Sequence, residues 1–464
     1  MNPDYSTYLS PFSWRYGSDE MRRIWSEKHK RELWRFLWVL LAETQAEFGL
    51  VRPDQVADLQ RNSQTIDMPR ALEIETEIHH DLMAELKTFA EQSPLGGSIL
   101  HLGATSADIE DNADVLRIRA SLELLLERLT ALLVDFAGKI EAWAETPLIA
   151  FTHLQPAEPS TLGYRFAGYA QDLFMDWEEL TRLRTGLRGK GFRGAVGTGA
   201  SYAELLGTEN LVRFESRLSE RLALPFFHVS TQVYPRKQDF LMASALAGLG
   251  GSLYKFAFDL RLLQSPPLGE LGEPFRTHQV GSSAMPFKRN PVQAEKLNSL
   301  GRLLAQMPRL AWDNAAHSLL ERTLDDSANR RILLPEAFLA ADEMLMVAVH
   351  IMKGLRVNQA ALQRNLSVYG PFAALERLLV RLGKAGADRQ EFHERLRVHA
   401  MAAWQAVQQG EPNPLAETIA TDTQIISYLG AEELKELTDS TQYLGDAPRR
   451  AREFAQILRK MTAD

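Results

Sequence analysis

The chain has 464 residues, 45% of them hydrophobic, which is enough for two or three domains with a sizeable core. Its 52 basic and 60 acidic side chains give a net charge of −8 and are spread along the sequence, which argues against a general binder of nucleic acid or anionic membranes. Because there is no cysteine, disulfides, zinc–thiolate sites and cysteine nucleophiles are excluded. The N-terminal stretch lacks the pattern of a secretory signal, so we expect a soluble, cytoplasmic protein.

Helical periodicity dominates the sequence. Between residues 112 and 143 apolar side chains recur at steps of three and four, which predicts a long helix with one buried stripe. Other leucines of this stretch lie off the stripe, so we expect a second packing partner, either in a central bundle or in a bundle shared between subunits. Long helical patterns also cover residues 162–187, 237–263 and 291–316, whereas alternating strand patterns are almost absent. The sequence therefore predicts an all-α protein.

Two changes of composition indicate domain boundaries. The stretch LGATSADIED, residues 102–111, interrupts the N-terminal helices before the long helix begins. Around residues 355–359 the chain leaves the central helices for a shorter, more charged C-terminal region.

A glycine-rich stretch at residues 189–194 fits GxGxxG, the fingerprint of dinucleotide-binding folds. That fingerprint needs a strand before it and a helix after it, whereas this stretch follows a helical run. We therefore interpret it as a turn between bundle helices.

The stretch GSSAMPFKRNP, residues 281–291, resembles neither ordinary core nor ordinary linker. Its glycine and serines predict a mobile segment, and Pro291 is suited to the first position of a helix. Lys288 and Asn290 then present a cation and an amide just before that helix, as expected for a loop that closes over a carboxylate or phosphate. Taken alone, such a loop is more often a solvated connection than a site, so its interpretation depends on its neighbours.

Three histidine-bearing segments stand out from the helical background. We predict that His79, His80 and Asp81 lie within an amphipathic helix. His101 is expected on a glycine turn and His153 between two helices. A single histidine of this kind is usually structural, but three at turn-rich junctions favour shared chemistry. No pair has the HExxH spacing of a zinc site, so we expect no catalytic metal.

The stretch ERTLDDSANRR, residues 321–331, places two arginines and a serine within one polar run. Arg322, Ser327 and Arg331 could hold a phosphate through guanidinium forks and a hydroxyl. The alternative is a solvated, salt-bridged helix start that is capped by Asp325 and Asp326.

The stretch GSSAMPFKRNP closely resembles the signature GSSxMPxKxNP of the fumarase/aspartase superfamily, in which it forms the mobile catalytic loop. Within that superfamily the chain is similar to the adenylosuccinate lyase family, particularly to its animal and some of its bacterial members. The resemblance extends nearly from end to end, through RYGSDEM at Arg15, HHDLM at His79, HLGATSADIEDN at His101, FTHLQP at Phe151, STQVYPRK at Ser230 and ERTLDDSANRR at Glu321.

This resemblance implies an all-α fold of three domains, an N-terminal one at residues 1–105, a central long-helix bundle with the catalytic loop at residues 106–357, and a C-terminal one at residues 358–464. It implies a homotetramer whose active sites are each built from three chains. The implied reaction is β-elimination of fumarate from adenylosuccinate, giving AMP, and from the succinylated aminoimidazole carboxamide ribotide. The resemblance implies no metal or organic cofactor, and we expect neither nucleic acid nor membrane as a partner.

The resemblance also assigns roles to individual residues. Ser282 would be the general base that removes a proton from the carbon beside the succinyl carboxylate, and His153 the general acid that protonates the departing nitrogen. Lys288, with Asn290 beside it, would stabilise the charge of the carbanion. Glu295 would orient a histidine.

The other implied site residues fall into two groups. The succinyl and base end would be lined by His80, which we count as catalytic, and by His79, Asp81, Thr105, Ser106, Thr152 and Gln232. The ribose phosphate and purine would be held by Arg15, Tyr16, Arg322, Ser327 and Arg331. His101 and Lys296 complete the expected substrate-binding set.

The sequence departs from the family pattern at a few positions. Lys296 replaces the arginine of the animal enzymes, His79 stands where arginine is common, and Leu319 and Leu320 replace an aromatic residue. The alternatives are a sister enzyme such as argininosuccinate lyase, fumarase or aspartase, and a non-catalytic relative of the crystallin kind. The phosphate-binding run and RYGSDEM favour a phosphorylated substrate, and the joint presence of Ser282, His153 and Lys288 favours an enzyme.

Overall fold

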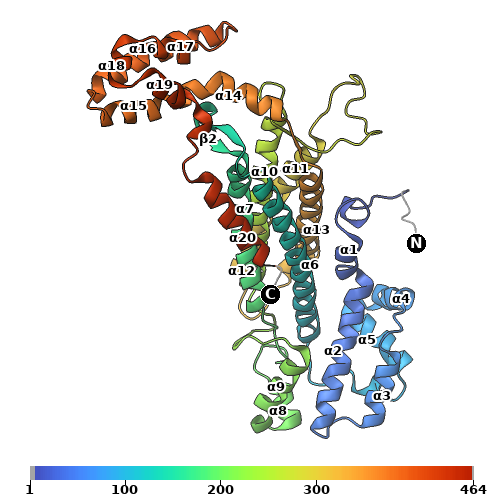
Figure 1. Cartoon of the computed structure of the whole chain (residues 1–464). Coiled ribbons are helices and arrows are strands. Elements are labelled where there is room, and N and C mark those ends of the chain that lie inside the picture. The colour runs from blue at the N-terminus through green and yellow to red at the C-terminus, as the bar shows by residue number, and fades with distance from the viewer. Residues whose placement is uncertain (1–5, 462–464) are drawn as a thin grey trace. The chain divides into compact units, whose positions relative to one another are not determined.

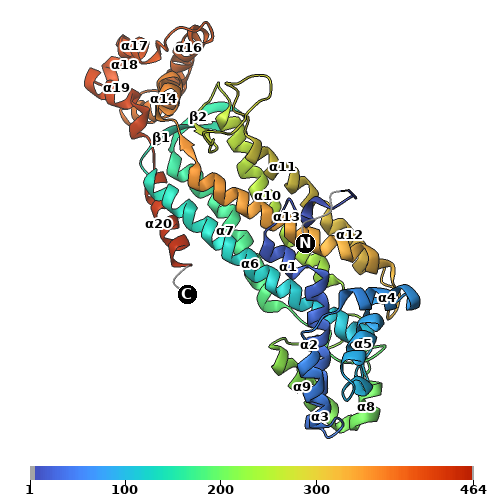
Figure 2. The same ribbon diagram turned by 90° about the vertical axis from the view of Figure 1, so that its right-hand side faces the viewer.

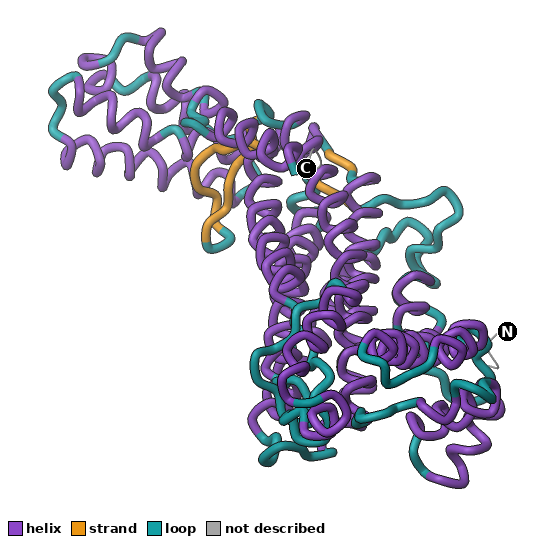
Figure 3. Tube along the Cα trace, turned by 90° about the horizontal axis from the view of Figure 1, so that it is seen from below, coloured by secondary structure: helices purple, strands orange, loops and turns teal. Residues whose placement is uncertain are grey.

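The computed structural model describes residues 6–461, which form a predominantly helical protein with few strands, as Figure 3 shows. The helices are α1 (Asp19–Ile24), α2 (Glu27–Glu47), α3 (Pro53–Asn62), α4 (Met68–Ile78), α5 (Asp81–Gln92), α6 (Ser106–Ala142), α7 (Leu162–Gly186), α8 (Ala200–Leu206), α9 (Leu211–Leu222), α10 (Lys237–Gln264), α11 (Val292–Leu304), α12 (Met307–Ala316), α13 (Asp325–Gly354), α14 (Gln359–Ala373), α15 (Leu375–Lys384), α16 (Arg389–Gln408), α17 (Leu415–Ala420), α18 (Thr423–Tyr428), α19 (Ala431–Thr438) and α20 (Ala447–Lys460). The strands are β1 (Pro147–Thr152), β2 (Gln155–Thr161), β3 (Leu271–Gly272) and β4 (Arg356–Val357). The all-α expectation is confirmed.

The described chain forms two compact units. The first comprises the residues up to 128 together with residues 176–251 and 300–346. The second comprises residues 129–175, 252–299 and those from 347 onward. These units cut across the boundaries expected near residues 105 and 357, because α6, α7, α10 and α13 each contribute to both. The division into three domains stays a prediction.

Three of the four long helical patterns are confirmed by α6, α7 and α10, whose labels can be followed in Figures 1 and 2. Helix α6 begins at Ser106, six residues before the predicted start, because Thr105 and Asp108 form a local cap through a 3.0 Å bond from the Thr105 N–H to the Asp108 carboxylate. In the second unit α6 packs on α10 through Phe136 and Phe256, whose ring centroids lie 5.5 Å apart. Tyr169 of α7 contacts the same Phe256 ring at 5.5 Å.

The helical pattern at residues 291–316 is two helices, α11 and α12, and not one as predicted. Pro308 lies in the first turn of α12, where proline is favoured, whereas in a helix interior it is disfavoured because it removes a backbone donor. Helix α11 begins at Val292, one residue after the predicted Pro291. The carboxylate of Glu273 accepts hydrogen bonds from the N–H groups of Gln293 and Ala294, at 3.1 and 3.0 Å, and so caps this helix.

His153 lies between two helices, α6 and α7, as expected, but the segment that joins them forms an antiparallel hairpin of β1 and β2, which was not predicted. Pairing of Thr152 with Gln155 leaves a turn of two residues, His153 and Leu154. The sequence did not predict these strands because their apolar and polar residues do not alternate regularly and β2 contains two prolines.

Among the described residues, α10 alone is long and apolar enough to cross a membrane by those two criteria. Core helices of soluble proteins meet the same criteria. Its Leu249, Leu253 and Phe256 are buried in the protein, so we interpret α10 as a core helix of the bundle.

Candidate active site

The first unit contains a cavity of about 620 Å³ where α2, α5, α6 and α13 meet the loop before α10. Nine of the residues singled out in the sequence line it: His79, His80, Asp81, Thr105, Ser106, Gln232, Arg322, Ser327 and Arg331. Segments more than 200 residues apart in the chain therefore converge on one pocket. The fold brings together both groups of residues that the sequence suggested, the histidine segment and the arginine–serine run.

His79, His80 and Asp81 do not lie within one amphipathic helix, which corrects the prediction. His79 ends α4 in a left-handed conformation, with φ 55°, and His80 is the N-cap of α5. The periodicity misled because α4 and α5 are each amphipathic, so the break between them leaves no gap in the pattern. His80 Nδ1 accepts the Met83 N–H at 3.4 Å, so Nε2 carries the proton of the neutral ring and lies 3.5 Å from Ser106 Oγ.

Asp81 and Arg331 form an ion pair across the pocket, with the Arg331 guanidinium nitrogen 2.8 Å from the Asp81 carboxylate. Lys30 of α2 lies 3.9 Å from the same carboxylate. Burial raises the pKa of Asp81, but Arg331 and Lys30 outweigh that effect and hold the pKa below its usual value. The pair is therefore ionised at neutral pH.

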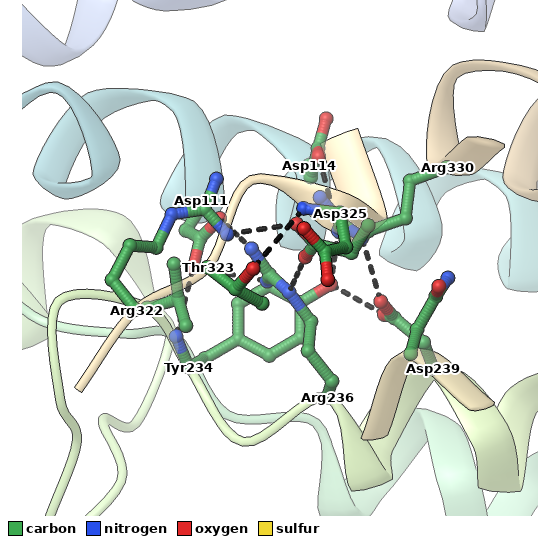
Figure 4. Close-up of polar contacts among 12 residues, drawn as sticks. Asp111, Asp114, Tyr234, Arg236, Asp239, Arg322, Thr323, Asp325 and Arg330 are labelled. Carbon is green, nitrogen blue, oxygen red and sulfur yellow. Dashed lines mark hydrogen bonds and ion pairs between the residues drawn. The ribbon is translucent and has the colours of Figure 1, made fainter. Parts of the chain in front are cut away.

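A buried network of arginines and carboxylates lies beneath the pocket (Figure 4). Both terminal nitrogens of Arg236 donate to Asp111 at 3.1 Å. Its Nε donates to Asp326 at 2.6 Å. Arg330 bonds Asp239 at 2.8 Å and the Tyr234 hydroxyl at 2.8 Å. Because each buried charge has a bidentate or multiple partner, the network fixes the geometry of this wall.

Arg322 is held in place by that network. Its NH1 donates to Asp326 at 2.8 Å, and the same carboxylate accepts from the buried Arg236. Burial raises the pKa of Asp326, but Arg236 and Arg330 outweigh it and keep the pKa low, so Asp326 stays a carboxylate. Helix α13 begins at Asp325, and the partial positive charge of its N-terminus adds to the attraction for an anion.

One carboxyl of the pocket behaves differently. Burial, and then Asp81, Asp111 and Asp114, raise the pKa of Glu110 to about 7, against an opposing effect of Arg331. Glu110 lies on α6 beside the predicted Thr105 and Ser106 segment, but nothing in the sequence distinguished it from a solvated glutamate. The pocket thus contains a carboxyl that gains or loses its proton near neutral pH.

His101, Arg15 and Tyr16 do not line the pocket. His101 has φ 67°, and its Nδ1 accepts the Trp38 indole N–H at 3.0 Å. Burial lowers the pKa of His101, which favours the neutral ring. The Arg15 guanidinium lies 5.6 Å from the Trp14 ring, and the Tyr16 ring meets Phe12 edge-on at 5.7 Å.

The hairpin that carries His153 belongs to the second unit. His153 and Leu154 have φ of 53° and 60°, conformations that cost energy in residues other than glycine. Thr152, His153 and Leu154 are all exposed. Strain of this kind concentrates at functional sites, and His79, His101 and His153 are three of the six such residues other than glycine among those described.

The signature loop is also in the second unit. Ser282 Oγ accepts the backbone N–H groups of Met285 and Ala284, at 3.1 and 3.4 Å. The loop closes at its base where Asn290 Nδ2 donates to the Gly281 carbonyl at 3.0 Å. A Cβ at Gly281 would lie 2.2 Å from the Lys288 carbonyl oxygen, so only glycine fits there.

Glu295 and Lys296 lie in the first turns of α11. Glu295 is exposed and forms an ion pair with Arg261 at 3.9 Å. Its expected role of orienting a histidine stays a prediction. Burial, Arg276 and Lys296 lower the pKa of His350. Across residues 6–461 no group of three histidine or carboxylate side chains is arranged to hold a metal ion.

Comparison with known proteins agrees with these motifs. The family described as "Lyase" matches residues 18–303, and the family described as "Adenylosuccinate lyase C-terminus" matches residues 371–454. An adenylosuccinate lyase of Schistosoma mansoni is 39% identical over 426 residues, covering 90% of this chain and 88% of the relative. One of Saccharomyces cerevisiae is 35% identical over 462 residues, covering 98% and 95%.

The chain belongs to the adenylosuccinate lyase family.

Solved structures show the same fold outside this family. The 3-carboxy-cis,cis-muconate lactonizing enzyme from Pseudomonas putida superposes with a TM-score of 0.84 at 27% identity, covering 96% of this chain and 99% of that chain. A fumarate lyase from Mesorhizobium sp. BNC1 also gives 0.84, at 25% identity, with 97% and 99% covered. The fold expected from the superfamily resemblance is therefore confirmed.

Several residues of the pocket were not among the site residues predicted from the adenylosuccinate lyase motifs. Trp25, Glu27, Lys30, Trp34, Glu75, Glu110, Asp114 and Arg117 line it, and so do Asp111, Arg236 and Arg330 of the buried network. Asp111 and Arg236 lie within motifs that the sequence did single out, HLGATSADIEDN and STQVYPRK. Glu110 and Arg330 lie within such motifs too. What the sequence could not show is the pairing of Arg236 with Asp111 and Asp326 and of Arg330 with Asp239, because these partners come from distant segments.

Proposed function

We propose that this protein is an adenylosuccinate lyase, which releases fumarate from adenylosuccinate to leave AMP and from the succinylated aminoimidazole carboxamide ribotide to leave the carboxamide ribotide. The observation that carries the proposal is the single pocket in which Arg322, Ser327 and Arg331 lie with His80 and Ser106. Arginines and a hydroxyl at the start of α13 suit a ribose phosphate. Family membership supplies the reaction class.

The reaction is a β-elimination with balanced proton movements. A base removes a proton from the succinyl carbon beside a carboxylate, the carbon–nitrogen bond breaks, and the purine nitrogen takes up a proton as fumarate leaves. We assign the base to Ser282. Two backbone N–H groups point at its Oγ, and such donors stabilise an alkoxide more than a neutral hydroxyl, which supports this assignment.

We assign the acid to His153, because its exposed position on a strained two-residue turn favours a role outside packing. Lys288 and Asn290 would hold the carboxylate that gains charge in the carbanion, and Glu295 would orient a histidine. Both His153 and the signature loop reside in the second unit, whereas the nucleotide pocket is in the first.

The remaining assignments follow the pocket lining. His79, His80, Asp81, Thr105, Ser106 and Gln232 would surround the succinyl and base end. Thr152, which lies outside the pocket lining at the end of β1, stays in this group as a proposal. Arg15, Tyr16, His101 and Lys296, which lie outside the pocket lining, stay in the proposed substrate-binding set.

The proposed assembly is a homotetramer with active sites shared between chains. Support comes from apolar side chains that a single chain leaves exposed on α10, namely Leu241, Phe258 and Leu262. A partner helix would cover them. We further propose a cytoplasmic protein of three domains that has neither nucleic-acid nor membrane partners.

The reverse reaction in deuterium oxide tests the chemistry. Incubated with AMP and fumarate, the protein should produce adenylosuccinate with one deuterium on the succinyl methylene carbon. The proton on the base exchanges with solvent deuterium, and the base then delivers that deuteron to the carbon. Absence of the adduct, while the folded protein binds AMP, would contradict the proposal.

A further inference from the structure

The second unit contains another cavity, of about 850 Å³, and of its lining residues only Lys288 and Asn290 have a role in the proposed elimination. It is lined by the C-terminal end of α10, strands β3 and β4, the start of α14 and the last residues of the signature loop. Five of its lining residues are cationic: Arg261, Lys288, Arg289, Arg356 and Arg364. None of its lining residues is an aspartate or a glutamate.

The carboxylates nearest in sequence are already committed elsewhere. Glu270 is buried and accepts from Arg165 at 2.6 Å and from Asn365 at 2.8 Å. Glu273 is buried and caps α11 through the N–H groups of Gln293 and Ala294. The two glutamates that flank β3 therefore do not neutralise the positive charge of this cavity. Of the five cations, Arg261 forms an ion pair with Glu295 at 3.9 Å, so the proposed site depends on the other four.

Two of the arginines are anchored through backbone carbonyls and not through acids. Arg356 Nε donates to the Glu273 carbonyl at 3.1 Å. Arg364 donates one terminal nitrogen to the carbonyls of Pro267 and Leu268, at 3.2 and 2.7 Å. A carbonyl orients a guanidinium without cancelling its charge, and each guanidinium has five N–H donors, so both retain donors for an anion.

The opposite wall is the base of the signature loop. Gln264 Nε2 of α10 donates to the Arg289 carbonyl at 3.0 Å, which ties the loop to the cavity. Lys288 and Arg289 are exposed, so their cationic side chains can turn toward an occupant. Phe287, Pro291 and Leu271 add apolar surface that suits the carbon skeleton of an organic molecule.

We propose that this cavity is a second, inhibitory binding site for a small organic polyanion that carries two or more phosphate or carboxylate groups. Arg356 and Arg364 bind one anionic group from the rigid wall, and Lys288 and Arg289 bind another from the loop. The occupant holds Lys288 away from the reacting carboxylate and restrains the loop. Only this effect on turnover rests on the proposed function; the binding itself does not.

Calorimetric titration of the whole protein with pyrophosphate tests the binding, with tricarballylate in a parallel arm to separate phosphate from carboxylate ligands. Chloride keeps the ionic strength constant, and an Arg322→Gln background weakens the contribution of the nucleotide pocket. We expect saturable binding that Arg356→Gln and Arg364→Gln each weaken at least tenfold. Arg364→Lys, which keeps the charge, should weaken it less.

Arg377→Gln is the matched control, because Arg377 also anchors to backbone carbonyls, those of Glu436 and Asp439, but lies outside the cavity. It should bind pyrophosphate as the parent does. Equal binding by Arg356→Gln, Arg364→Gln and the parent would overturn the proposal, as would the absence of saturable binding of either probe.

Limited digestion with trypsin reports on the loop independently of turnover. Pyrophosphate should slow cleavage after Lys288 and Arg289 in the parent protein and leave the rate unchanged in Arg364→Gln. Where the protein is active, pyrophosphate inhibition should likewise fall in Arg364→Gln, whose activity without the anion stays at the parent level. Binding without any protection of the loop would overturn the coupling between site and loop.

Discussion

The side-chain oxygen of Ser282 lies 3.1 Å from the backbone nitrogen of Met285, within a loop that a second hydrogen bond closes at Gly281. A serine Oγ that accepts N–H groups is oriented and electrostatically prepared to become an alkoxide. The loop therefore supplies to the proposed base an environment that an isolated serine lacks.

Ser282→Ala should reduce kcat by about 10²–10⁴-fold and leave the affinity for substrate nearly unchanged, because only proton transfer is lost. The neighbouring Ser283→Ala is the control and should retain most of the activity. Steady-state kinetics together with equilibrium binding of AMP measure the two effects. If Ser282→Ala turned over near the parent rate, the base would be another residue.

Arg322→Gln should raise KM about ten- to a hundredfold, since a charge-assisted contact to phosphate is lost. Arg309→Gln is a matched control: Arg309 pairs with Asp313 four residues on, as Arg322 does with Asp326, but lies outside the pocket. A substrate analogue without the phosphate should bind the parent and Arg322→Gln about equally. If Arg322→Gln weakened binding of the substrate and of the phosphate-free analogue equally, the effect would be structural and not a loss of phosphate binding.

Glu110 should make stability depend on pH. Its pKa is about 7 in the folded protein, compared with 4.5 for an ordinary glutamate, so the folded state binds the proton more tightly than the unfolded state does. The associated stability is fully present below pH 4.5 and is lost as pH rises to about 7, and it amounts to about 3 kcal/mol. Glu110→Gln should therefore raise the Tm at pH 8 but not at pH 4.5. The exposed Glu127→Gln on the same helix should show no such pH-dependent gain.

Leu154→Gly should stabilise the hairpin by about 0.5–1 kcal/mol, because glycine adopts its positive φ without strain and the leucine side chain is 71% exposed. Thermal unfolding measures this gain. Val380→Gly, at an exposed helical position, should instead lose stability. A lower Tm for Leu154→Gly would show that the leucine side chain supports the turn.

The long helices could be predicted from sequence because α6, α7 and α10 repeat one apolar spacing over many turns, which averages out local exceptions. The breaks between consecutive helices could not be predicted. The left-handed His79 separates two amphipathic helices, and Pro308 restarts a helix without changing the pattern. The hairpin at His153 was missed because its strands are short and rich in proline.

For the site, motif resemblance identified residues that carry distinctive chemistry at turns, such as His80, Arg322 and Arg331. It could not identify Arg236 and Arg330 as the supports of that wall, because their partners are fixed by tertiary packing. Glu110 illustrates the same limit: its raised pKa arises from burial among Asp81, Asp111 and Asp114, and only two of those are its neighbours on α6.

The most direct test of the account is ultraviolet-monitored turnover of the purified, chelator-treated protein with adenylosuccinate, argininosuccinate, malate and aspartate in parallel. We predict rapid release of fumarate from adenylosuccinate and none from the other three. Turnover of argininosuccinate, malate or aspartate in place of adenylosuccinate would contradict the assignment of a phosphorylated substrate, and inactivity toward all four would contradict the proposed enzyme.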